Sequence, residues 1–183
     1  MISEAAGAGV IRQDVQQAIE SEVRYRLGEG DAPGALSRWQ KELLLLVIQT
    51  VKANACLSQL HARAAVKAGA TLAQVLQVVQ YVELTGMVKW VMDGYIRMRE
   101  NFVKPDPLGA VPKKLMELAI IAADIVQAHP WGAVRHTQRF IKDGGTVPEL
   151  IEAVALAMIE DGVQHYKTCG REVIEAAEHI LSA

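Results

Sequence analysis

Apolar residues recur every three or four positions along most of the chain, the spacing of helices that bury one side. No segment shows a sustained two-residue alternation of apolar and polar residues. The pattern predicts helices over residues 10–27, 36–53, 56–68, 71–84, 86–103, 112–128, 131–143, 146–161 and 163–181. The longest breaks, 28–34 and 104–109, contain glycine and proline. We therefore expect an all-α fold.

Signals at the predicted helix ends support this division. Thr71 is followed three residues later by Gln74, and Thr146 by Glu149, which is the pattern of a capping box. Gly69 follows the predicted helix 56–68, at a place where a left-handed glycine commonly ends a helix.

The chain repeats a set of residues after 75 positions. The shared positions include a carboxylate, an imidazole, a glycine and a capping hydroxyl: Glu42/Glu117, Ala53/Ala128, His61/His136, Lys67/Lys142, Gly69/Gly144 and Thr71/Thr146. An ungapped match of this kind indicates a duplicated helical unit. We therefore predict one domain over residues 1–183, with an N-terminal helix (10–27), repeat one (36–103) and repeat two (112–182).

The repeated glutamate and histidine are candidates for acid/base chemistry. On one unbroken helix, the 19 residues between Glu42 and His61 would separate them by roughly 28 Å. Breaks at Asn54 and at His129-Pro130 allow the chain to fold back in each half. A carboxylate hydrogen-bonded to an imidazole would fix its tautomer and raise its basicity. A structural hydrogen bond would also be kept in both halves, so the pattern alone leaves both interpretations open.

Composition narrows the classes of partner. A formal net charge of −2 gives no basic field for nucleic acid or an anionic membrane. The longest apolar run, residues 43–48, is far shorter than the ~20 residues of a membrane span. The first residues lack the basic and apolar regions of a secretory signal, so we expect a cytoplasmic protein with reduced cysteines. Abundant alanine and few aromatic residues give smooth helix surfaces that suit subunit association.

The segments from Leu57 to Thr71 and from Val134 to Glu152 resemble the core motif of the carboxymuconolactone decarboxylase and AhpD-like superfamily. That motif is a histidine, small residues, then Gly-x-Thr eight residues on, followed by an acidic or amide residue that opens a helix. The resemblance extends from about residue 36 to about residue 177 and is closest to the tandem two-repeat forms. It implies an AhpD-like helical fold, a homo-oligomer (dimer, trimer or hexamer) and a small-molecule substrate, with no cofactor and no metal.

The AhpD-like branch of the superfamily uses a Cys-x-x-Cys pair, a histidine and a glutamate that precedes the histidine by the same interval as separates Glu42 from His61. The resemblance places Glu42 and Glu117 on the glutamate and His61 and His136 on the histidine. The cysteine positions hold Asn54 and Leu57 in the first half and His129 and Gly132 in the second. Without two thiols at bridging distance, the usual dithiol chemistry is missing. An AhpD-like peroxidase acting through Cys56 alone stays an alternative, as does a non-catalytic helical oligomer or binding protein.

The decarboxylase branch keeps the histidine without the cysteine pair. This branch implies a non-redox lyase in which a Glu-His relay delivers a proton to a small, carboxylated substrate. The second half is the stronger candidate for the active site, because it adds His129 at the first cysteine position and has Trp131 close to it. The catalytic candidates are thus Glu117, His136, His129, Glu42 and His61, and the substrate-binding candidates are Arg139, Trp131 and Arg63. Asp161, His165 and Cys169 recur every four residues, a spacing that also leaves a metal site open.

Overall fold

The computed structural model describes residues 11–27, 34–84, 111–162, 164 and 166–182. Within these ranges every regular element is helical and no strand occurs, so the predicted all-α class is confirmed. None of the helices in the described ranges is both long and apolar enough to cross a membrane. The helix predicted over 86–103 and the site candidate His165 lie outside the described residues.

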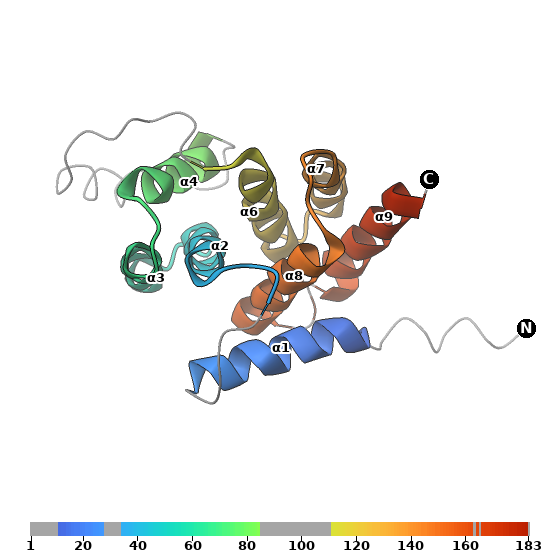
Figure 1. The fold of residues 1–183 in the computed structure, drawn as a ribbon, viewed down its shortest axis with the longest axis horizontal. Coiled ribbons are helices and arrows are strands. Elements are labelled where there is room, and N and C mark those ends of the chain that lie inside the picture. The colour runs from blue at the N-terminus through green and yellow to red at the C-terminus, as the bar shows by residue number, and fades with distance from the viewer. Residues whose placement is uncertain (1–10, 28–33, 85–110, 163, 165, 183) are drawn as a thin grey trace, which may run out of the picture.

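The helices are arranged around a central group formed by α2, α6 and α8 (Figure 1). Helix α1 (Gln13–Arg26) packs along α8 (Val147–Asp161), and α3 (Ala55–Lys67) packs against α2 (Arg38–Val51). Helix α4 (Leu72–Leu84) also contacts α2. On the other side, α7 (Pro130–Lys142) lies between α6 (Lys113–Val126) and α9 (Arg171–Ser182).

The core follows from the longest apolar stretches of the sequence. Residues 43–48 of α2 are fully buried, and α6 and α8 contribute Leu118, Ile121, Ile125, Leu150 and Leu156. Because these helices are buried on most sides, only a few polar side chains lie within them. Two of them, Glu42 and Asp124, belong to the candidate site described below.

The helix bounds follow the offset of the sequence repeat closely. Helix α6 begins and ends at the positions that correspond to the ends of α2, α7 does the same relative to α3, and α8 begins at the position that corresponds to the start of α4. Ala53 and Ala128 end α2 and α6 with left-handed φ angles of 56° and 53°. This conformation, uncommon for residues other than glycine, reverses the chain at the same place in both halves.

The predicted caps form. Thr71 Oγ1 accepts from the backbone N–H of Gln74 at 3.2 Å, and the Gln74 side chain accepts from the N–H of Thr71 at 2.8 Å. Thr146 and Glu149 make the equivalent capping box at the start of α8. Gly69, with φ 111°, follows α3 as expected.

The last helix differs from its prediction. In place of one α-helix over 163–181, the chain forms a π-helical turn, η1 (Tyr166–Gly170), before α9. Gly170 ends the turn, and a glycine, which favours a regular helix less than other residues do, makes such a change of pitch less costly. The turn buries Tyr166 and Cys169 between α6, α7 and α8.

Candidate functional site

Each glutamate bonds to the histidine of its own half. Glu42 on α2 lies 2.7 Å from His61 on α3, and Glu117 on α6 lies 2.6 Å from His136 on α7, in both cases from Oε2 to Nδ1. The chain reversals between the paired helices place these groups opposite one another. A carboxylate can only accept a hydrogen bond, so Nδ1 donates and Nε2 is left as the ring nitrogen that can exchange a proton.

The first pair belongs to a buried ionic cluster. Arg38 donates to Glu42 Oε1 and, at 3.1 Å, to Glu22 on α1. Glu22 is 3% exposed and also bonds Arg26 at 3.1 Å and Lys41 at 3.3 Å. The Glu42 carboxylate therefore interacts with a permanent cation as well as with His61, an arrangement typical of a structural ion network.

The second pair has no such cation among the described residues. Lys113 takes the position of Arg38 on α6, but its side chain is exposed and makes no ion pair within these residues. Glu117 and His136 are 16% and 18% exposed, so both are reachable from solvent. The charge of Glu117 is thus directed at His136 alone, which suits a proton-transferring pair better than the first half does.

A second carboxylate and imidazole pair lies on the same two helices. Asp124 Oδ1 on α6 is 3.2 Å from Nδ1 of His129, the residue before α7. Asp124 is 3% exposed, and its Oδ2 is buried with no hydrogen-bond partner among the described residues. Burial raises the pKa of this carboxyl, while His129 and His136 oppose the shift. His129 is a candidate from the sequence whereas Asp124 is not, although a polar residue inside an otherwise apolar helix is a signal.

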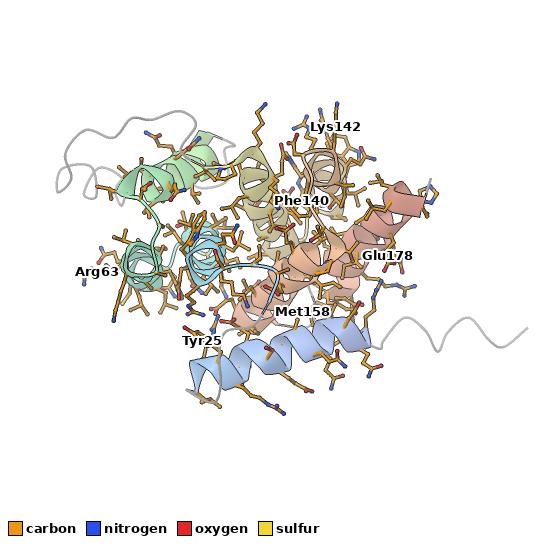
Figure 2. The ribbon with its side chains drawn as sticks, viewed as in Figure 1. Tyr25, Arg63, Phe140, Lys142, Met158 and Glu178 are labelled. Carbon is orange, nitrogen blue, oxygen red and sulfur yellow. The ribbon has the colours of Figure 1, made fainter. Side chains whose placement is uncertain are left out.

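The candidate substrate-binding residues lie around α3 and α7. Trp131 is 69% exposed at the start of α7, and Arg135 stacks over its ring at 5.5 Å from the centroid. Arg139 is exposed one turn after His136, which puts the two on one side of the helix. Arg63 is exposed on the outer side of α3, and Figure 2 shows it pointing away from the other helices. The spacing of two residues between His61 and Arg63 directs their side chains to different sides.

The two cysteines lie in different environments. Cys56 is exposed near the start of α3, whereas Cys169 is buried in η1. Burial, with the charges of Asp124 and Glu172, raises the pKa of the Cys169 thiol to about 12. Asp161, at the end of α8, pairs with Lys52 at 2.6 Å. Among the described residues, no group of three or more metal-binding side chains is placed to hold an ion.

Comparisons with protein-family models, with curated proteins and with solved structures found no match for this chain. The superfamily resemblance therefore stays a prediction from the sequence.

Proposed function

We propose that the protein is a non-redox enzyme of the carboxymuconolactone decarboxylase type, with its acid/base pair at Glu117 and His136. The observation that carries the proposal is the 2.6 Å bond between Glu117 Oε2 and His136 Nδ1, on a partly exposed pair with no competing cation among the described residues. Such a bond orients the imidazole and stabilises its protonated form, which is what a general acid needs. In the first half, Glu42 also accepts a hydrogen bond from Arg38, which favours a structural role for the Glu42 and His61 pair.

The reaction is proton delivery to a carbon that loses carbon dioxide. The bond between that carbon and its carboxylate breaks, carbon dioxide leaves, and the electron pair stays on the carbon. The carbon then takes the proton from Nε2 of the His136 imidazolium. Glu117 holds the Nδ1 hydrogen throughout, and solvent returns a proton to Nε2 for the next cycle.

The substrate of this proposal is a small carboxylated molecule, such as a carboxylated lactone. Arg139, on the same side of α7 as His136, supplies a cation for a carboxylate, and exposed Trp131 supplies an apolar surface. Arg63 would serve the first half only, since it lies on α3. Assembly into a homo-oligomer, which the family resemblance implies, belongs to the same proposal.

The test measures carbon dioxide release from gamma-carboxymuconolactone by the wild-type protein and by single variants. His136→Ala is expected to lose roughly 10²- to 10⁴-fold in kcat, the usual contribution of a general acid. Glu117→Gln should lose activity as well, because a neutral amide stabilises the imidazolium less. Cys56→Ala should keep full activity, and His61→Ala serves as the matched control in the first half.

Two other functions predict different results. An atypical peroxidase acting through the exposed Cys56 would consume an organic hydroperoxide, and Cys56→Ala, not His136→Ala, would abolish that activity. In a non-catalytic protein, His61→Ala and His136→Ala would change only the free energy of unfolding. Either pattern, with no carbon dioxide released by the wild type, would contradict the proposed decarboxylase.

A further inference from the structure

Three differences between the halves occur together at the place where α6 meets α7. Position 49 on α2 is glutamine, whose Nε2 donates to Glu160 at 2.6 Å, and Asn54 caps α3 by accepting from the N–H of Leu57 at 3.2 Å. The corresponding positions of the second half hold Asp124, His129 and Gly132. There the side chain of His129 makes no helix cap and bonds Asp124 instead.

Gly132 is needed for this contact. A Cβ atom at position 132 would lie 2.6 Å from Nδ1 of His129 and 2.8 Å from Oδ2 of Asp124, both closer than real Cβ contacts allow. Leu57, which carries a full side chain at the equivalent position of α3, shows that this place in the helix does not itself demand glycine. The absence of a side chain at 132 therefore makes room for the Asp124 and His129 pair.

The buried carboxyl faces several other ionisable groups. His129 bonds it at 3.2 Å, its charge interacts with that of His136 on α7, and it helps to raise the pKa of Cys169 in η1. Within the part of the chain that the structure describes, Oδ2 of Asp124 has no partner in the interior, which is a costly position for a charged oxygen. Burial raises the pKa of Asp124, so this carboxyl gains and loses its proton at a pH closer to neutral than an ordinary aspartate does.

We propose that Asp124 is a positioning residue of the second-half acid/base site, and this inference rests on the proposed function. It holds His129 through Nδ1, with Gly132 leaving the space, and it presents its charge to His136. The ionisation of Asp124 is therefore coupled to both imidazoles of α7. His129, 57% exposed, connects this buried group to solvent.

The test follows the ring nitrogens of the histidines and the Asp124 carboxyl carbon by NMR across a pH series. In the wild type, the His129 tautomer with hydrogen on Nδ1 is expected, and the Asp124 carboxyl should titrate above 3.8, the ordinary value. Asp124→Asn keeps an acceptor for His129 but removes the charge. That variant should keep the His129 tautomer and change the His136 signals, although Asp124 makes no hydrogen bond to His136.

Gly132→Ala tests the contact between His129 and Asp124 without removing the charge of Asp124. The added Cβ should push aside both the His129 ring and the Asp124 carboxylate and so release His129 from the Nδ1 tautomer, while the charge of Asp124 is kept. Asp143→Asn, at the exposed end of α7, is the matched acid control and should leave His136 unchanged. Exposed His179 on α9 is an internal reference that no variant should move.

Two results would overturn the positioning role. One is a wild-type His129 ring that carries its hydrogen on Nε2 instead of Nδ1. The other is a set of His136 signals that responds equally to Asp124→Asn and Asp143→Asn. These readouts need no substrate, so a protein that fails the decarboxylase assay but shows the coupled titration would refute the proposed function alone.

Discussion

Removing the negative charge of Glu22 should lower the free energy of unfolding substantially, because Glu22 forms ion pairs with three cations. Its carboxylate, 3% exposed, accepts from Arg26, Arg38 and Lys41 at 3.1 to 3.3 Å. Lys41 is itself only 5% exposed. Replacement by glutamine keeps the size of the side chain and removes the charge that three cations share.

The loss in the free energy of unfolding depends on which other carboxylate each cation still contacts when Glu22 is replaced. Breaking a buried ion pair from one side costs about 3–5 kcal/mol, because the remaining charge is left in the interior. Lys41 keeps Glu152 at 3.3 Å, Arg26 keeps Glu160 at 2.7 Å, and Arg38 keeps Glu42. The cost should therefore be at the lower end, about 3 kcal/mol, which corresponds to a fall in Tm of about 6–12 °C for a chain of this size.

Urea unfolding followed by circular dichroism measures this loss for Glu22→Gln. The midpoint should fall with the slope m unchanged, since the folded state exposes no new surface. Glu20→Gln is the matched control, because Glu20 is exposed on the same helix, and it should change the free energy of unfolding by less than about 0.5 kcal/mol. A loss of about 1 kcal/mol or less for Glu22→Gln, typical of a surface ion pair, would refute the buried cluster.

Two further predictions concern thiol reactivity and pH. Cys56 should react with Ellman's reagent in the native protein, whereas Cys169, buried and with its pKa raised to about 12, should react only after unfolding. Equal rates for the two thiols would contradict the buried position of η1. Arg12 lowers the pKa of Asp14 and of Glu178 by hydrogen bonding, and so links α1 to α9. Arg12 should contribute about 1 kcal/mol or less to the free energy of unfolding at this exposed site. The contribution should be present above the unfolded pKa values of 3.8 for Asp14 and 4.5 for Glu178, and it should be lost as the pH falls through their lowered pKa values in the folded protein. Urea unfolding of Arg12→Gln against wild type should thus show a difference at pH 7 that disappears in acid.

Helix positions were predictable because local signals specify them. The periodic apolar residues, the capping boxes at Thr71 and Thr146 and the glycine at 69 placed most helix ends within a few residues of the structure. The breaks predicted at Asn54 and His129 are present, since each residue lies directly before the second helix of its pair. The left-handed residues are the preceding alanines, Ala53 and Ala128, which could not be predicted because alanine carries no sequence signal for that conformation.

The Glu and His pairs were predictable from their spacing, but their surroundings were not. The bonds of Glu42 to His61 and of Glu117 to His136 follow from two helices joined by one reversal. The Glu22 contact with Arg38 could not be read from the sequence, because it depends on how α1 packs along α8 and so brings Glu22 to the side chains of α2. Burial of Asp124 is also a tertiary property, for it depends on η1 and α9 covering the end of α6 and α7.

The same bond between glutamate and histidine lies in different surroundings in the two halves. Glu42 accepts a hydrogen bond from Arg38, and Arg38 also bonds Glu22 on α1. The negative charge of Glu42 is therefore shared between Arg38 and His61. Behind Glu117 no cation is present among the described residues, and a second acid, Asp124, lies within electrostatic reach of His136. Because a carboxylate supports an imidazolium only with charge that is not already neutralised, the proposed proton transfer is assigned to the half that lacks the arginine. An arginine introduced at Lys113 tests this directly: Lys113→Arg should bring a fork of donors to Glu117 and lower kcat, whereas Arg38→Lys should leave kcat unchanged.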